Sequence, residues 1–481
     1  MLLSRLLDGI CEYRGEDLEI QRITSSPDQL REGDCFVLLR GVFRDNGHLL
    51  HRAIEKRPAF ILSEQALAID IPSLRVENSR EVLSRLLYRF YFDTQSPPRL
   101  VGITGTNGKS SVCHILAHIL KKHHKVGTIG TQTIELDGIS LAPQGYTMTT
   151  PDPELLYPTL YQMKKMGCEI VVMEISSHAL ALGKVCPLVF DAAIFTGLSE
   201  DHLDFHKTKE SYQRAKQKIF SLSRSAVLNT ECKAGQEYLA SLTIPALTVA
   251  RKNASFELTD ITSVGLESTR FLCQIDNEEH CIRIPLLGEH NAFNAVYALA
   301  AAMLLGIDRK DAIDSLGKIS KIKGRLEVVS QRPTVILDYA HTPSSMQAVL
   351  SYINQAKPEG SKTVVVFGAG GDRDRKKRPL MSRIAEENAD FCVLSTDNMR
   401  SEPQSQIFAD LKRGLQKQNH RFVTDRTHAV AYAYKLCSAN DILVLLGKGH
   451  EDYILKRNKR IPYSELYALH LAKKGENTNE N

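Results

Sequence analysis

The chain of 481 residues contains no tryptophan, and its ten cysteines are scattered without a Cys-x-x-Cys pair or a Cys/His ligand spacing. Neither a zinc site nor a disulfide framework is therefore expected. The longest apolar run, AVYALAAAMLLGI, is too short to cross a bilayer, and Arg5 and Asp8 interrupt the first residues before a signal-like core forms. These absences predict a protein of the reducing cytoplasm that is neither secreted nor inserted in a membrane.

A strong charge of one sign is also missing, because 61 Lys and Arg residues face 56 Asp and Glu residues. The basic cluster at 121–125 ends a predicted helix, where cations offset the helix dipole, and the cluster at 372–379 is interleaved with aspartate. No nucleic-acid-binding motif accompanies them, so we expect no nucleic-acid partner. The length and the 43% hydrophobic content predict several globular domains instead.

Three blocks of different pattern follow one another. Residues 1–97 mix short strands and helices and end at the turn-prone DTQSPPR. Residues 98–325 alternate helical patterns with apolar runs typical of buried parallel strands, such as EIVVMEIS. Residues 326–481 show four such runs, each ending in polar residues. The pattern predicts an α/β protein with a small N-terminal domain, a central doubly wound P-loop-type domain and a C-terminal Rossmann-like domain.

The segment ITGTNGKS lies between the strand pattern RLVGIT and the helical pattern VCHILAHILKK. Its glycines allow close backbone approach, Lys109 suits the β- and γ-phosphates, and Ser110 suits magnesium. The Walker A pattern is incomplete, because Ile103 stands where its first glycine is expected. A chance glycine turn is the alternative, but the flanking strand and helix favour phosphate binding.

Further residues of the central block are weaker signals. Glu174 ends EIVVMEIS and His202 lies in SEDHLDFH, beyond another apolar run. Alone, each would more often be an ordinary polar residue, but the shared edge of a parallel sheet would bring both to the phosphate loop and so favours a metal site. The residues alone predict Lys216 as a solvated helix lysine, and GEHNAFNA as either a helix cap or an adenine contact.

The four polar strand ends of the last block predict one shared ligand site. In LSTDNMRSEP, an acid, an amide and a guanidinium occur within four residues, at Asp397, Asn398 and Arg400. Such a set can bind a carboxylate and an ammonium together. The alternative is that Arg400 is a surface arginine paired with Glu402.

Taken together, these motifs resemble those of the Mur ligases. The following segments occur in the order of that family: TGTNGKS, TTPDP, MEISSHAL, SEDHLDFH, AKQKIF, GEHNAFNA, GRLE, DYAHTP, GGDRDRKKRP, DNMR and GKGHE. The resemblance implies a monomeric, Mg²⁺-dependent enzyme that uses ATP to activate a carboxylate as an acyl phosphate. The motifs match the members that add an amino acid to UDP-N-acetylmuramoyl-L-alanyl-D-glutamate in cytoplasmic peptidoglycan precursor synthesis.

The resemblance also implies roles for individual residues. ATP would contact Thr106, Asn107, Gly108, Lys109, Ser110, Ser111, His290, Asn294 and Arg325. Magnesium would be held by Ser110, Glu174, His202 and Lys216. Lys216 would carry a CO2-derived carbamate, which replaces a cation that repels the metal by an anionic oxygen ligand. The UDP-muramyl dipeptide would contact Ser25 or Ser26, Thr149, Thr150, Ser176 and Lys184. Asp338 and His341 would line the reaction centre, as candidates for accepting a proton from the amine.

The incoming amino acid would contact Arg373, Asp397, Asn398, Arg400, Gly447 and Glu451. Because the arginine of this motif marks diaminopimelate-using members, we expect meso-diaminopimelate as the substrate. The chain departs from the family pattern at Met399, where proline is usual, and at Leu182 and Lys184, where Gln and Arg are common. Three alternatives stay open: the same ligase using L-lysine, a folylpolyglutamate synthetase, and a nucleotide-binding switch without catalysis.

Overall fold

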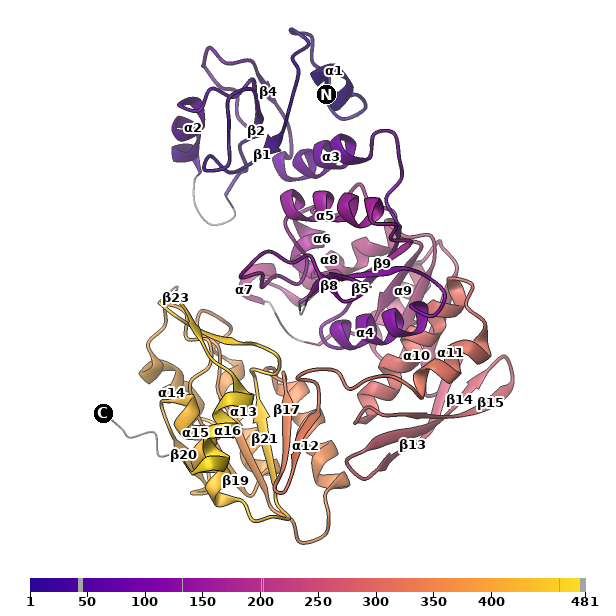
Figure 1. The fold of residues 1–481 in the computed structure, drawn as a ribbon, viewed down its shortest axis with the longest axis vertical. Coiled ribbons are helices and arrows are strands. Elements are labelled where there is room, and N and C mark those ends of the chain that lie inside the picture. The colour runs from indigo at the N-terminus through magenta and orange to yellow at the C-terminus, as the bar shows by residue number, and fades with distance from the viewer. Residues whose placement is uncertain (42–45, 132, 200, 202, 458, 476–481) are drawn as a thin grey trace.

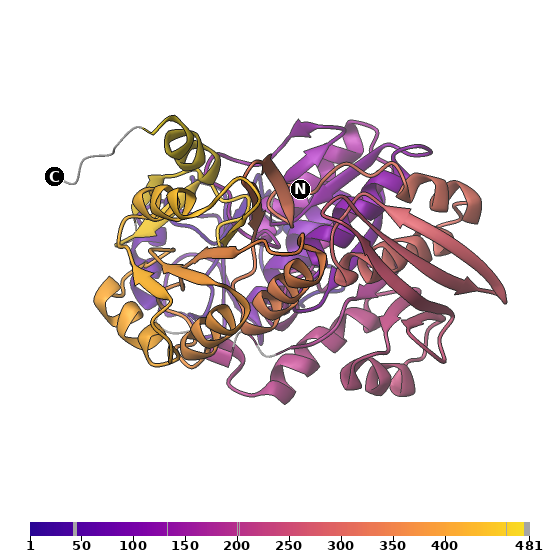
Figure 2. The ribbon, with the colours of Figure 1, turned by 90° about the horizontal axis from the view of Figure 1, so that it is seen from below.

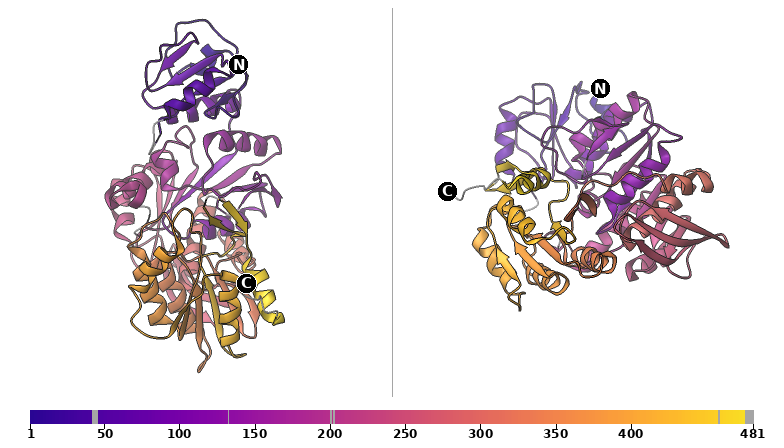
Figure 3. Two further views of the ribbon diagram at one scale, coloured as in Figure 1. Left: turned by 90° about the vertical axis from the view of Figure 1, so that its left-hand side faces the viewer. Right: turned by 60° about the horizontal axis from the view of Figure 1, so that its bottom comes forward.

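The computed structural model describes residues 1–41, 46–131, 133–199, 201, 203–457 and 459–475. Three parts of the chain follow one another along the long axis, with the N-terminal part at one end and the C-terminal part at the other (Figure 1; Figure 3, left). Each part is built around its own mainly parallel sheet, so the predicted α/β class is confirmed. Among the described residues, no helix is both long and apolar enough to span a membrane.

The N-terminal part contains a four-stranded parallel sheet in the order β1-β2-β3-β4. Its elements are α1 (Leu3–Leu7), β1 (Ile23–Thr24), β2 (Cys35–Val37), α2 (Gly47–Ile54), β3 (Phe60–Ser63), β4 (Ser73–Arg75) and α3 (Ser79–Phe92). Helix α3 packs on α5 (Pro153–Lys165) of the central part, where the Tyr88 and Tyr157 rings lie 6.3 Å apart. Leu86 of α3 and Leu160 of α5 belong to one continuous hydrophobic core, so the first two parts share buried apolar surface.

The central part is an 11-stranded sheet in the order β15-β14-β13-β12-β11-β10-β5-β9-β6-β7-β8. The strands from β13 to β6 run parallel, and antiparallel strands extend both edges. Besides α5, the elements are β5 (Arg99–Thr104), α4 (Lys109–Leu120), β6 (Val126–Ile129), β7 (Ile134–Leu136), β8 (Ile139–Ser140), β9 (Ile170–Glu174), α6 (Ser177–Ala181), β10 (Ala192–Phe195), α7 (Leu203–His206), α8 (Lys209–Ser221), β11 (Ala226–Asn229), α9 (Lys233–Ser241), β12 (Ala246–Ala250), β13 (Phe256–Val264), β14 (Ser268–Ile275), β15 (Glu278–Ile284), α10 (Glu289–Leu304) and α11 (Arg309–Leu316). Helix α10 packs closely on α4, which places both helix starts near the phosphate loop.

The C-terminal part has a six-stranded sheet in the order β16-β17-β21-β18-β19-β20, parallel except for β16. Its elements are β16 (Glu327–Gln331), β17 (Thr334–Asp338), α12 (Pro343–Ala356), β18 (Thr363–Phe367), α13 (Lys377–Asn388), β19 (Phe391–Leu394), α14 (Gln404–Lys412), β20 (His420–Phe422), α15 (Arg426–Leu436), β21 (Ile442–Leu446), β22 (Tyr453–Lys456), β23 (Lys459–Pro462) and α16 (Glu465–Lys474). The four predicted apolar runs are β17, β18, β19 and β21. Seen from below, this sheet lies beside the central part, opposite the long β13–β15 ribbons (Figure 2).

Candidate active site

The phosphate loop joins β5 to α4, and its glycines are required by close contacts. Gly108 has φ 87°, and a Cβ there would stand 2.6 Å from Oδ1 of Asn294 on α10. A Cβ on Gly105 would stand 1.9 Å from Oγ1 of Thr196. Only glycine accommodates both the left-handed backbone and this crowding. The loop therefore exposes main chain at the start of a helix, an arrangement that suits phosphate oxygens.

Two lysines converge on this loop. The Gly105 carbonyl accepts hydrogen bonds from Nζ of Lys109 at 3.0 Å and from Nζ of Lys216 at 2.8 Å. Lys216 is 2% exposed, so the expectation of a solvated lysine is wrong. Burial, together with the positive charge of Lys109, holds the pKa of Lys216 well below its usual range. The structure thus places an amine with a strong tendency to be neutral beside a phosphate-binding loop.

A second cluster of oxygens gathers around Glu174, which is 2% exposed. Its Oε2 accepts the Ser110 hydroxyl at 2.9 Å and the Thr131 hydroxyl at 3.1 Å, and its Oε1 accepts the Thr131 N–H at 3.0 Å. Hydroxyl and carboxylate oxygens are the ligands that Mg²⁺ prefers, so these residues fit the ion. The predicted ligand His202 lies outside the described residues, and within the described ones no set of three His, Cys, Asp or Glu side chains could hold a metal.

The predicted muramyl-peptide residues lie next to this cluster. The hydroxyl oxygens of Thr131 and Thr149 lie 2.9 Å apart, and Thr150 donates to the Glu174 carbonyl at 2.9 Å. The Ser176 N–H in turn donates to Oγ1 of Thr150 at 2.9 Å. These hydroxyls therefore lie within one hydrogen-bond network with the candidate metal carboxylate. Lys184 is placed apart from that network, where its Nζ lies 2.6 Å from Oδ1 of Asp152 before α5.

The two serines considered for the uridine differ in their contacts. Ser25 donates its N–H and its hydroxyl to the Glu154 carboxylate at 2.8 and 2.7 Å, and Thr24 donates to the same group at 2.7 Å. The Ser26 main chain is bonded, because its N–H donates to Oγ1 of Thr24 and its carbonyl accepts from the Gln29 N–H, each at 3.1 Å, whereas its hydroxyl makes no hydrogen bond with any described residue. Ser25 therefore joins the N-terminal and central parts, and Ser26 does not.

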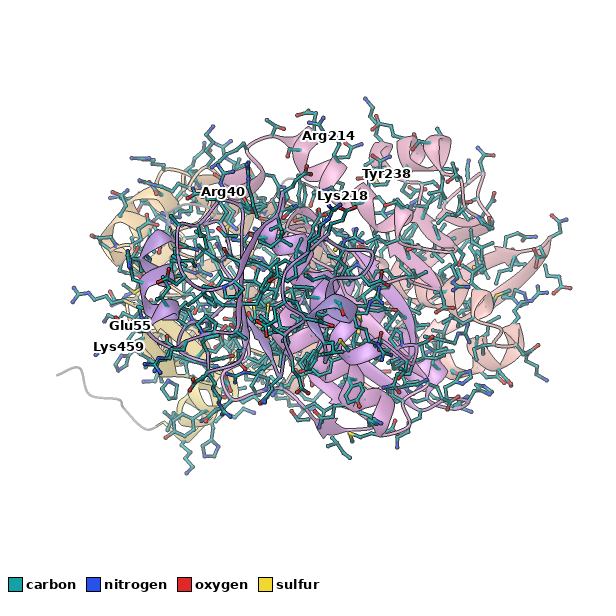
Figure 4. All side chains as sticks on the ribbon, turned by 90° about the horizontal axis from the view of Figure 1, so that it is seen from above. Arg40, Glu55, Arg214, Lys218, Tyr238 and Lys459 are labelled. Atoms are coloured by element: carbon teal, nitrogen blue, oxygen red, sulfur yellow. The ribbon has the colours of Figure 1, made fainter. Side chains whose placement is uncertain are left out.

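The N-terminal sheet also has its own cleft at the carboxyl ends of β2, β3 and β4. Within the described residues it encloses about 1030 Å³, and its lining includes Arg40, Glu64, Arg75 and Glu77. Arg40 is labelled in Figure 4, which looks down on this end of the molecule. Sequence reasoning did not identify these residues, because strand-end polar groups in so short a sheet resemble ordinary loops.

A cavity of about 520 Å³ lies between the central and C-terminal parts. Of the residues predicted to bind ATP, its lining includes Asn107, Gly108, Ser111, His290, Asn294 and Arg325. It also includes Asn229, Arg251 and Phe293, which the sequence did not single out. The guanidinium of Arg251 lies 5.9 Å from the Phe293 ring centre, so a wall formed by a cation and an aromatic ring lines the same cavity as the phosphate loop.

A second cavity, of about 420 Å³, brings together three groups of predicted residues. It is lined by Lys109 and Ser110 of the phosphate loop, by Thr149 and Glu174, and by the C-terminal residues Arg373, Asp397, Asn398, Arg400, Gly447 and Glu451. Lys377 at the start of α13 also lines it, although the sequence reasoning did not name this lysine as a site residue. Because both cavities include Arg325 and His341, they meet at one place.

The DNMR segment is anchored by main-chain contacts to β22 and to Arg457 directly after it. Arg400 has φ 53°, and its N–H donates to the Leu455 carbonyl at 3.0 Å. Its guanidinium donates to the Gly371 carbonyl at 2.7 Å. Glu402 instead accepts from the fully buried Arg378 at 2.6 Å, so the alternative of an Arg400–Glu402 surface pair is wrong. A left-handed non-glycine residue held in this way is common at functional sites.

Asp338 and His341 have different chemical capacities. The Asp338 carboxylate accepts the N–H groups of Leu326 and Ala340, each at 2.7 Å, so both oxygens are used in shaping the loop. Nδ1 of His341 lies 2.9 Å from the Tyr339 carbonyl, which requires the proton on Nδ1 and leaves the Nε2 lone pair available. Burial, reinforced by the charge of Lys377, lowers the pKa of His341 to about 4. Of these two candidates for accepting the proton of the amine, only His341 offers a neutral nitrogen with an available lone pair.

Two family models match the chain. The Mur ligase middle domain matches residues 103–302, and the Mur ligase glutamate ligase domain matches residues 324–449. A UDP-N-acetylmuramoyl-L-alanyl-D-glutamate--2,6-diaminopimelate ligase from Bacillus cereus is 34% identical over 451 residues, covering 91% of each chain. A protein with the same name from Caldanaerobacter subterraneus is 34% identical over 476 residues, covering 97% of each chain.

Solved structures are similar in fold. A UDP-N-acetylmuramoyl-L-alanyl-D-glutamate--2,6-diaminopimelate ligase has a TM-score of 0.69 at 26% identity, covering 99% of both chains. A Mycobacterium tuberculosis folylpolyglutamate synthase complexed with ADP has a TM-score of 0.64 at 18% identity, covering 76% of this chain and 91% of its own. The second likeness shows a common fold alone.

Proposed function

Because this chain belongs to the Mur ligase family, we propose that it joins meso-2,6-diaminopimelate to UDP-N-acetylmuramoyl-L-alanyl-D-glutamate, converting ATP to ADP and phosphate. The single observation that carries the proposal is the cavity lined at once by Lys109, Thr149 and Arg400. It brings the phosphate loop, the threonines beside Glu174 and the DNMR segment into one space. The enzyme acts as a monomer in the cytoplasm, in peptidoglycan precursor synthesis.

The first step forms an acyl phosphate, because a carboxylate at neutral pH resists attack by an amine. The γ-carboxylate of D-glutamate attacks the γ-phosphorus of ATP, and ADP leaves. Lys109 and the loop N–H groups bind the phosphates and offset their charge. Mg²⁺, when bound by Ser110 and Glu174, supplies further neutralisation of phosphate charge. The wall formed by Arg251 and Phe293 holds the base of ATP.

In the second step, the amino group of diaminopimelate attacks the acyl carbon and phosphate leaves. The amine must be neutral to attack, and Nε2 of His341 accepts its proton directly or through water. The far carboxylate of diaminopimelate pairs with Arg400 and Arg373, while Asp397 and Glu451 accept from the far ammonium. L-Lysine lacks that carboxylate and binds more weakly.

The buried amine of Lys216 suits carbamoylation. A neutral amine reacts with CO2, whereas an ammonium does not, and the depressed pKa of Lys216 favours the neutral form. The amine adds to CO2 and releases a proton to solvent, and the resulting carbamate supplies an anionic oxygen close to the cation of Lys109 and to the phosphate loop. We propose this modified lysine as a further ligand of Mg²⁺, beside Ser110, Glu174 and His202.

Phosphate release tests the proposed reaction. It should require ATP, UDP-muramyl dipeptide and diaminopimelate together, and Lys109→Ala should abolish it while leaving the melting temperature close to that of the wild type. Turnover with a folate acceptor in place of the muramyl dipeptide would favour a folylpolyglutamate synthetase. ATP binding without phosphate release in the full mixture would instead indicate a nucleotide-binding switch.

A further inference from the structure

Lys448, directly after β21, is a charged residue that the proposed reaction does not use. Its side chain is completely buried. Its Nζ lies 2.7 Å from Oε2 of Glu451, 3.0 Å from Oδ1 of Asn398 and 3.3 Å from Oδ1 of Asp397. An ammonium has three donors, so Lys448 spends its whole hydrogen-bonding capacity on three residues of the amino-acid cavity.

These contacts join two segments that share no main-chain pairing. Asp397 and Asn398 follow β19, whereas Lys448 and Glu451 follow β21, and β18 separates the two strands in the sheet. Because β18 lies between them, the two strands are not hydrogen-bonded to each other in the sheet. The Lys448 ammonium connects the two polar segments, together with the Asn398 amide, which donates to Glu451.

The same contacts decide which way the Asn398 amide points. Its Oδ1 accepts from Lys448 and from the Leu455 N–H at 2.9 Å, so its Nδ2 must donate, and it does so to Oε2 of Glu451 at 2.9 Å. Glu451 Oε2 is thereby saturated. Its Oε1 has only long contacts, at 3.4 and 3.5 Å, with the hydroxyls of Tyr339 and Tyr453. One carboxylate oxygen is thus left for a ligand.

The charges of this cluster also favour binding of a ligand by its carboxylates. Burial raises the pKa of Asp397, but Lys448 and the neighbouring Arg426 outweigh this and hold it below its usual range. The cluster joins two carboxyl side chains to one lysine, so it contains more acidic than basic groups. Without Lys448, two carboxylates would share a buried space, and their repulsion would favour taking up a proton over accepting from a substrate ammonium.

We propose that Lys448 is a positioning residue for recognition of the amino-acid substrate, an inference that rests on the proposed function. Lys448 does not line the cavity, as far as the described residues define it, whereas Asp397, Asn398 and Glu451 do. By holding these three, it leaves Oδ2 of Asp397 and Oε1 of Glu451 for the far ammonium of diaminopimelate. A side chain on Gly447 would crowd this arrangement, since a Cβ there would lie 3.1 Å from Oδ2 of Asp397.

Lys448→Met tests the positioning role, because it keeps the length of the side chain and removes the ammonium. We expect the KM for diaminopimelate to rise at least tenfold, while the KM values for ATP and UDP-muramyl dipeptide stay within twofold. A role confined to stability would lower the melting temperature and move none of the KM values. Should Lys448→Met fail to fold, Lys448→Gln, which keeps amide donors without the charge, is measured in the same way with the same expectation.

The matched control is Glu386→Gln. Glu386 is a buried carboxylate in the same part of the chain, 3% exposed, and it accepts the N–H groups of Gln416 and Lys417 at 2.8 Å. This variant should lose stability without a change in the KM for diaminopimelate. A diaminopimelate KM for the Lys448 variant within threefold of the wild-type value overturns the positioning role alone. Failure of the wild type to form product with diaminopimelate overturns the proposed function itself.

Discussion

The Glu154 carboxylate, at the start of α5, accepts both the N–H and the hydroxyl of Ser25, at 2.8 and 2.7 Å. This contact crosses from the N-terminal part to the central part, whereas the neighbouring Ser26 hydroxyl has no hydrogen-bond partner in the part of the chain that the structure describes. Ser25→Ala should therefore lower the free energy of unfolding by about 1–2 kcal/mol, because it removes a donor from a partly buried carboxylate.

Ser26→Ala should leave stability unchanged and raise the KM for UDP-muramyl dipeptide severalfold. Urea unfolding and substrate titration of the two variants side by side provide the check. The reverse outcome, with Ser26 needed for stability and Ser25 for the KM, would contradict the assignment.

Lys216→Ala should be nearly inactive, because it removes the buried amine beside Lys109 that we propose carries the carbamate. Added formate or acetate should restore part of the activity by supplying a carboxylate oxygen in its place. Lys218, two residues along α8, is exposed and is labelled in Figure 4, so Lys218→Ala is the matched control with normal activity. Full activity of Lys216→Ala would rule out a catalytic role for this lysine.

Arg400→Ala should lose roughly two orders of magnitude or more in kcat/KM for diaminopimelate, because a buried charge-assisted contact typically contributes about 2–5 kcal/mol. L-Lysine has no far carboxylate, so its kcat/KM should change far less in the same variant. Parallel assays with both amino acids measure the difference. Equal losses for the two substrates, or equal use of both by the wild type, would contradict the choice of diaminopimelate.

Stability should fall as the pH drops from 7 towards 5. Burial lowers the pKa values of His290 and His341 to about 4, below the ordinary value near 6.5. Between those values the unfolded chain binds more protons, so stability is present above about pH 6.5 and is lost as the pH falls towards 4. Each histidine should contribute up to about 2 kcal/mol between pH 7 and 5.

The contribution of the two histidines is measured with a double variant, His290→Asn with His341→Gln. Its midpoint of urea unfolding is compared with that of the wild type at pH 7 and at pH 5. The variant should lose less stability on acidification. An equal pH dependence in the two proteins would show that these histidines are not the groups responsible.

The local sequence pattern was sufficient to predict the strand, loop and helix around Lys109. It also predicted the four polar strand ends of the C-terminal part. Periodicity and turn residues act over short distances, so they are readable without the fold. The direction of parallel strands then places their ends at one edge, which is why Asp397 and Glu451 could be expected to line one site, as they do.

Tertiary structure alone decided which of these residues are buried and what each one contacts. Lys216 appears solvated by its helix pattern, yet it reaches the Gly105 carbonyl, 111 positions away in the chain. Ser25 and Glu154 meet across 129 positions, and Lys448 joins segments about 50 positions apart. Periodicity reports which face of an element is apolar, but partners this distant are set only when the elements pack. The low pKa of Lys216 follows from that packing, because burial and the neighbouring charge of Lys109 disfavour its charged form.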